Sequence, residues 1–166
     1  KTKHLFPALG MIPINRAGAA ASNTALDPAR RVLQEGGLFG IFPEGTRSRN
    51  GLLHKGHTGL ARLALQTGAP IVPVGIIGTD IVQPPDAPFP KPVMIRYGNP
   101  IIVDRYVGRS DDRTLLRELT DEVMFEIRAL TGQKYVHQYA TRTADVAPEP
   151  VAPVDLPPAN RELVTV

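Results

Sequence analysis

The chain has 166 residues, enough for about one domain with a single hydrophobic core. Its 42% hydrophobic and 21% charged residues are typical of a globular protein, and neither a signal peptide nor a run of roughly 20 apolar residues is present. The absence of cysteine excludes disulfide frameworks, thiolate metal sites and cysteine nucleophiles.

Positive charge is concentrated in the first part of the chain. Residues 1–62 hold nine Lys and Arg against three Asp and Glu, a net charge of +6, whereas the remainder holds ten against thirteen, a net charge of −3. This asymmetry indicates an anionic partner, which is a phosphate ligand, an anionic membrane or nucleic acid. Nucleic acid is disfavoured because aromatic residues are few and do not alternate with basic ones.

The first predicted elements are a strand and a helix. Residues 5–14, LFPALGMIPI, predict a short strand that leads to Arg16. A helix is predicted within residues 22–37, with Asp27 among its possible caps, Pro28 suited to its first turn and two glycines at its end.

The next elements surround a polar sequence. Residues 38–42, LFGIF, predict a buried strand because they are continuously apolar, and the sequence FPEGTRS follows directly. Residues 57–69 predict a helix that Gly68 stops. Residues 70–79, PIVPVGIIGT, predict another apolar strand.

The second half continues with a loop, two strands and a helix. Five prolines make residues 83–92 an irregular loop, and residues 93–98 and 101–104 predict strands. Leucine, valine and isoleucine follow one face of a helix predicted at residues 111–130. Residues 141–166, rich in Pro and Ala, predict a disordered tail.

The alternation of helices and strands predicts an α/β fold with a mixed, largely parallel sheet flanked by helices. One domain is expected over residues 1–140, followed by the tail. In such sheets ligands bind outside the carboxyl ends of the strands. The FPEGTRS sequence is therefore expected at a binding edge.

FPEGTRS combines the groups that an anion site needs. Gly45 permits a tight turn whose amides can form an anion-binding concavity, and Thr46 and Ser48 can donate hydrogen bonds. Arg47 offers a planar fork for phosphate or carboxylate, and Glu44 can orient it or accept hydrogen bonds from a hydroxylated ligand. The alternative is a solvated turn in which Glu44 and Arg47 merely pair.

Further candidates lie on either side of this sequence. Arg16 and Lys55 would complete a phosphate pocket if they lie near Arg47, and are otherwise solvated surface charges. The four histidines are candidates for a general base, but none is followed by a carboxylate at a diagnostic spacing. His54 and His57 stand three apart without a third ligand, so no metal site is expected.

Three motifs together carry a family resemblance. GMIPINR at residues 10–16, FPEGTRS at residues 42–48 and IVPV at residues 71–74 resemble the second, third and fourth blocks of the lysophosphatidic acid acyltransferases, also called 1-acyl-sn-glycerol-3-phosphate acyltransferases. The resemblance covers about residues 5–103. It implies transfer of a fatty acyl group from acyl-CoA or acyl-carrier protein to lysophosphatidic acid or a related lysophospholipid, giving phosphatidic acid in phospholipid biosynthesis, without a cofactor or metal.

The resemblance also assigns roles to residues. The acceptor phosphate would be bound by Arg16, Arg47 and Lys55. The acceptor pocket would be shaped by Glu44, Gly45, Thr46 and Ser48. An acyl-binding or structural wall would be formed by Pro73 and Val74.

One block of the family is missing. Its catalytic pair is a histidine followed by an aspartate after four intervening residues, and no His-x4-Asp occurs in this sequence. We therefore expect a fragment that lacks the amino-terminal part of the domain and is inactive alone. The alternative is a non-catalytic phosphate- or lipid-binding module or a degenerate paralogue. Because the implied substrates reside in a bilayer, the resemblance also implies a peripheral protein at the cytoplasmic face of the cell membrane.

Overall fold

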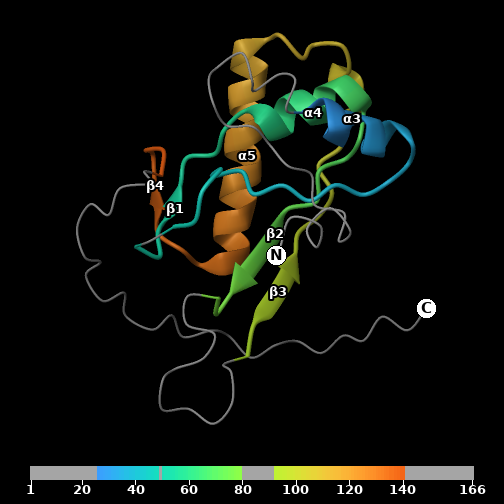
Figure 1. Cartoon of the computed structure of the whole chain (residues 1–166). Helices are drawn as coiled ribbons and strands as arrows, with labels where there is room; N and C mark the ends of the chain where they lie inside the picture. The colour runs from blue at the N-terminus through green and yellow to red at the C-terminus, as the bar shows by residue number, and fades with distance from the viewer. Residues whose placement is uncertain (1–25, 49, 80–91, 141–166) are drawn as a thin grey trace, which may run out of the picture.

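A computed structural model gives the structure of the chain and describes residues 26–48, 50–79 and 92–140. Within these residues, helices flank two small sheets, so the predicted α/β class is confirmed (Figure 1). Parallel pairing among them is limited to one short pair of strands. The predicted strand at residues 5–14 and the tail at residues 141–166 lie outside the described residues.

Helices α3 (Asp27–Gln34) and α4 (Gly59–Thr67) pack against each other. Pro28 stands in the first turn of α3, where its missing amide proton has no helical partner to lose. Asp27 does not cap α3 but lies inside its first turn, where it pairs with Arg30 at 2.9 Å. Gly68 ends α4 in the left-handed conformation, as predicted.

Helix α5 (Arg113–Thr131) confirms the predicted helix to within two residues at its start. The Asp112 side chain caps it by accepting a hydrogen bond of 3.1 Å from the Leu115 amide. Gly132, at φ +73°, ends it. Both boundaries therefore follow from local sequence signals.

The antiparallel sheet contains two predicted strands, β2 (Val74–Ile77) and β3 (Met94–Tyr97). The strand predicted at residues 101–104 is reduced to a single antiparallel bridge between Ile71 and Ile101. A 3-10 turn, η1 (Asp104–Tyr106), follows and turns the chain toward α5.

The second sheet is a short parallel pair that was not predicted. Strand β1 (Leu53–His54) pairs with β4 (Tyr135–Val136). Strand β1 precedes α4 and β4 follows α5, so this pairing places the chain after α5 beside the chain before α4 (Figure 1).

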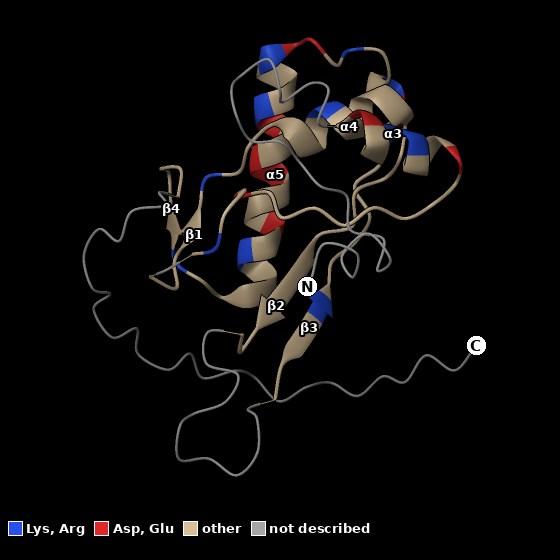
Figure 2. Cartoon of the chain, in the orientation of Figure 1, with Lys and Arg blue, Asp and Glu red and all other residues tan. Residues whose placement is uncertain are grey.

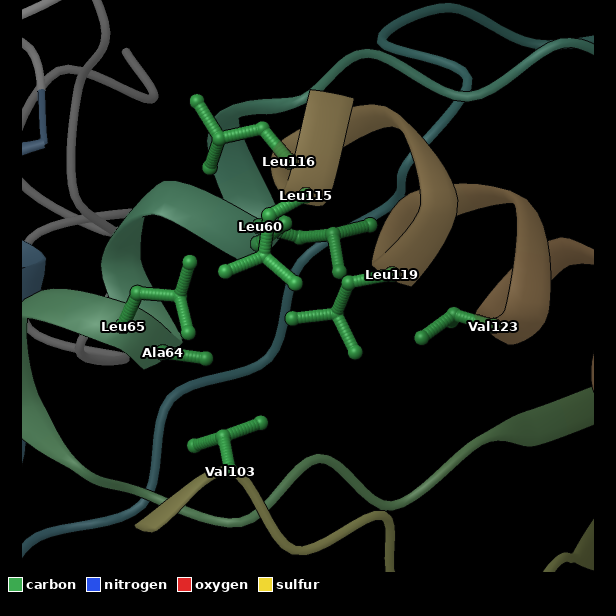
Figure 3. Close-up of a cluster of buried hydrophobic side chains, with 9 residues drawn as sticks. Leu60, Ala64, Leu65, Val103, Leu115, Leu116, Leu119 and Val123 are labelled. Atoms are coloured by element: carbon green, nitrogen blue, oxygen red, sulfur yellow. The ribbon is translucent and has the colours of Figure 1, made fainter. Parts of the chain in front are cut away.

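The hydrophobic core lies between α4 and α5 (Figure 3). Leu65 and Ala61 of α4 and Val103 are completely buried, and Leu116 of α5 is 2% exposed. In Figure 3 the leucines of the two helices point toward one another, with Val103 on the side of the strands. Burying a side chain of this size contributes about 1.5–3 kcal/mol.

The prediction of a buried strand at residues 38–42 is wrong. These residues form no strand, and the Leu38 and Phe42 side chains are 96% and 77% exposed. The physical reason is that no described segment pairs with them in a sheet, and of their large side chains only that of Phe39 is partly buried. The FPEGTRS sequence therefore does not follow a buried strand, and its position depends on other contacts.

Candidate functional site

The FPEGTRS loop (residues 42–48) contains a tight turn at Gly45. The Gly45 amide donates a hydrogen bond of 3.1 Å to the Phe42 carbonyl, and its φ is +70°. A Cβ at this position would also lie 3.0 Å from Cδ2 of His57. The turn predicted at Gly45 is confirmed, and both its backbone conformation and its close neighbour favour glycine.

Glu44 holds this turn to β1. Its Oε2 accepts a hydrogen bond of 2.9 Å from the His54 amide and lies 3.2 Å from Nδ1 of the His54 ring. Both side chains are largely buried. The alternative in which Glu44 pairs with Arg47 is therefore wrong, because the carboxylate is engaged with His54. A role of Glu44 toward a hydroxylated ligand stays a prediction.

Asn50 stabilises the end of the loop that follows Arg47. Its Oδ1 accepts hydrogen bonds from the Ser48 hydroxyl at 3.0 Å and from the Leu52 amide at 3.1 Å. Its Nδ2 lies 3.5 Å from Nε2 of His54. The Ser48 hydroxyl thus supports the loop, and its predicted place in a ligand pocket is not tested by this bond.

Arg47 lies at the exposed part of this anchored loop. Neighbours on both sides are fixed, Glu44 by His54 and Ser48 by Asn50, while Arg47 forms no ion pair with another described residue. Thr46, between Gly45 and Arg47, is partly buried. A guanidinium held on a fixed loop is suited to bind an external anion bidentately.

Lys55 lies between the loop and a second segment, residues 135–139, which we call the 135–139 segment. The Lys55 amide donates a hydrogen bond of 2.9 Å to the Gln138 carbonyl. Its Nζ lies 3.1 Å from Nε2 of His137 and 5.6 Å from the centre of the Tyr139 ring. Figure 2 shows basic residues on the chain segments around β1 and β4, so positive charge gathers on this side.

His57 connects the loop with the same segment. Its amide donates a hydrogen bond of 2.8 Å to the Pro43 carbonyl, and its ring stacks on Tyr139 with the centres 4.6 Å apart and the planes 11° from parallel. Partial burial, followed by the positive charge of Arg117, lowers the pKa of His57 below its usual value of 6.5. The neutral imidazole is therefore its main form at neutral pH.

Helix α5 supports the chain between Lys55 and His57. Arg117 forms two hydrogen bonds with Asp121, at 2.9 and 2.6 Å, and donates a third, of 2.8 Å, to the Gly56 carbonyl. A Cβ on Gly56 would lie 2.9 Å from the Met124 sulfur, so the chain approaches α5 too closely for a larger residue. The site is thus attached to the hydrophobic core through α5.

The remaining predicted site residues are placed as follows. Pro73 is completely buried beside β2, and its carbonyl accepts a hydrogen bond of 2.9 Å from the Gly98 amide. Val74 is partly buried at the start of β2. Arg16 lies outside the described residues, so its distance from Arg47 and Lys55 is not defined.

Sequence reasoning missed Asn50, Arg117 and Tyr139, and it named His137 only as one of four candidates for a general base. A signal for His137 and Tyr139 exists, because Tyr135, His137 and Tyr139 alternate in the sequence YVHQY, as residues on one face of a strand do. No local signal shows that this face contacts Lys55, which is 82 residues away from His137 along the chain.

In residues 26–48, 50–79 and 92–140, no group of three His, Cys, Asp or Glu side chains could hold a metal ion. In the same part of the chain, none of the helices has the length and apolarity that crossing a bilayer requires.

Comparisons with known proteins bear on the same residues. A family model described as Acyltransferase matches residues 2–77, which include the FPEGTRS loop. A 1-acyl-sn-glycerol-3-phosphate acyltransferase of Limnanthes douglasii is 37% identical over 118 residues, which cover 64% of this chain and 42% of the relative. An enzyme of the same name from Borreliella burgdorferi is 39% identical over 72 residues, which cover 43% of this chain and 29% of the relative.

These matches have a limited extent. The chain spans less than half the length of these curated relatives. A protein of Mycobacterium tuberculosis whose name assigns no activity is 30% identical over 150 residues. No solved structure matches the chain.

Proposed function

Because this chain belongs to the acyltransferase family that includes the 1-acyl-sn-glycerol-3-phosphate acyltransferases, we propose that it binds the acceptor in an acyl transfer to lysophosphatidic acid. The product is phosphatidic acid, a phospholipid precursor. The observation that carries this proposal is the FPEGTRS loop, which holds exposed Arg47 between two anchored residues.

The loop supplies the acceptor with position and charge. Arg47 can bind two phosphate oxygens with its fork. The Gly45 amide donates to Phe42, and the amides that follow it lie in a turn of the kind that can bind anions. Lys55 and, by family resemblance, Arg16 add positive charge. Fixing the phosphate places the free hydroxyl of the acceptor near the thioester, and such proximity is worth about 7–11 kcal/mol of the barrier in favourable cases.

The reaction needs no covalent enzyme intermediate. The acceptor oxygen attacks the thioester carbonyl carbon, a C–O bond forms, and the C–S bond breaks as the thiol leaves. A general base takes the proton of the hydroxyl and passes it to the leaving sulfur. We propose acyl-CoA or acyl-carrier protein as the donor, and the cytoplasmic face of the cell membrane as the place, since the acceptor is a membrane lipid.

The family's catalytic pair, which contains the general base, is missing from these 166 residues. No His-x4-Asp occurs in the sequence, and we propose that the chain alone binds the acceptor without turning it over. His57 is neutral and lies beside Gly45, but it has no carboxylate partner among the described residues. The missing His-x4-Asp also favours the second candidate, a non-catalytic module that binds phosphate or lipid.

One experiment separates the two candidates. The full-length protein is incubated with lysophosphatidate and radiolabelled acyl-CoA, or with acyl-carrier protein as donor, and labelled phosphatidate is measured. The enzyme proposal predicts turnover by the full-length protein and none by the 166-residue chain. Binding of lysophosphatidate without turnover by the full-length protein would support the module instead.

A further inference from the structure

The 135–139 segment lies beside residues 53–57, which follow the FPEGTRS loop. Tyr135, His137 and Tyr139 alternate along it, and the rings of Tyr135 and His137 are 6.3 Å apart. Pairing of β1 with β4 fixes this segment beside Lys55. The chain after α5 thus forms a wall beside residues 53–57. The motifs of the loop assign this wall no role in acceptor binding.

This wall restrains Lys55. Its ammonium donates to the His137 ring over 3.1 Å and lies 5.6 Å from the centre of the Tyr139 ring, within the range of a cation–π interaction. A lysine side chain has four flexible methylene groups, so two contacts at its end remove much of that freedom. One of its three donors is used by His137, which leaves two for a ligand.

Tyr139 joins this lysine to the loop. One contact of its ring is the Lys55 ammonium, and another is the stacked ring of His57, which in turn lies against Gly45. Tyr139 is 48% exposed, so its outer part borders open space. A shift of Tyr139 would therefore change the position of Lys55 and the packing of the Gly45 turn together.

We propose that His137 and Tyr139 are positioning residues of the acceptor site, and that they hold Lys55 in place to select a headgroup that ends in a phosphate monoester. This inference rests on the proposed function. A monoester offers three terminal oxygens, enough for both the Arg47 fork and the Lys55 ammonium. A phosphocholine headgroup has two such oxygens and a quaternary ammonium, which the Lys55 charge repels.

The test compares two acceptors in the full-length protein, lysophosphatidate and lysophosphatidylcholine, with acyl-CoA as donor. His137→Ala and Tyr139→Leu are each expected to raise the KM for lysophosphatidate about fivefold. This is the change in affinity that the loss of one contact to a cation produces. The kcat and the KM for acyl-CoA stay within about twofold of the wild type, and the preference for lysophosphatidate over lysophosphatidylcholine falls.

Conservative variants separate positioning from folding. In His137→Gln the side-chain amide oxygen can accept the Lys55 hydrogen bond near the position of the imidazole Nε2, and Tyr139→Phe keeps the aromatic ring. Both variants should therefore keep most of the wild-type affinity for lysophosphatidate. Tyr97→Leu is the matched control, because Tyr97 is a 70% exposed tyrosine on β3. It should leave the KM for both acceptors unchanged.

Failure of this inference differs from failure of the proposed function. If the wild type does not acylate lysophosphatidate, the proposed function is wrong. If the wild type does so and both disruptive variants keep its acceptor KM and preference, the inference is overturned. Should Tyr139→Leu not fold, His137→Ala decides, since His137 is exposed and its loss leaves no cavity.

Discussion

The α4–α5 core and residues 38–48 are held in place by different forces. In the core, Leu65, Val103 and Leu116 are 0–2% exposed. In the other region Leu38 and Phe42 are 96% and 77% exposed, and the FPEGTRS loop is fixed by hydrogen bonds from His54 to Glu44 and by a glycine turn. Stability and acceptor binding are therefore expected to respond to different substitutions.

The largest stability effect is expected in the core. Leu116→Ala removes a side chain that is 2% exposed, which should lower the free energy of unfolding by about 2–5 kcal/mol. Denaturant unfolding measures this change. The KM for lysophosphatidate, measured where the variant is still folded, should not change. A raised KM at full folding would show that the two regions are not independent.

Glu44→Ala should affect both properties. It removes the acceptor of the His54 amide and ring, and a buried amide without a partner costs about 1–3 kcal/mol. Thermal unfolding should show this loss, and the acceptor KM should rise because Arg47 loses its fixed support. Glu44→Gln keeps one acceptor oxygen and should have a smaller effect. If both variants had the Tm and the acceptor KM of the wild type, Glu44 would not anchor the loop.

His57 provides a smaller, pH-dependent effect. Burial and Arg117 lower its pKa in the folded chain, so protonation favours the unfolded chain. Stability should thus be full above the usual pKa of 6.5 and decrease as the pH falls through the lowered value. Melting curves at pH 7.5, 6.5 and 5.5 should show a smaller decrease for His57→Gln. An identical decrease in both proteins would contradict this assignment.

The smallest effect is expected at the exposed apolar residues. Phe42→Ser changes a side chain that is 77% exposed and leaves the carbonyl that accepts from Gly45 in place. The free energy of unfolding should change by less than about 0.5 kcal/mol. A loss as large as that of Leu116→Ala would mean that Phe42 is buried in solution.

Local signals explain which features could be predicted. Gly45 and Gly68 marked a turn and a helix end because left-handed backbone favours glycine wherever the surrounding chain lies. The helical periodicity of α5 likewise needed no knowledge of its partner. The strand at residues 38–42 was wrong because an apolar run indicates burial but does not supply the segment that would bury it.

The supports of the site could not be predicted in this way. Lys55 and His137 are 82 residues apart, and β1 and β4 have only two residues each, too few for a periodic signal. The partner of Glu44, ten residues along the chain, depends on the path of the loop and not on spacing. Arg47 and Lys55 as phosphate-binding residues were proposed from their side-chain chemistry and from the family resemblance, and they stay predictions.

The central claim is that Arg47 holds the acceptor phosphate. It is tested most directly by the kinetics of Arg47→Ala in the full-length protein, with Arg31→Ala, an exposed arginine of α3, as the control of equal charge. We predict that Arg47→Ala lowers kcat/KM for lysophosphatidate by about tenfold to a hundredfold without changing Tm, while Arg31→Ala changes neither. Unchanged acceptor kinetics with a lowered Tm would contradict the claim and make Arg47 a structural residue.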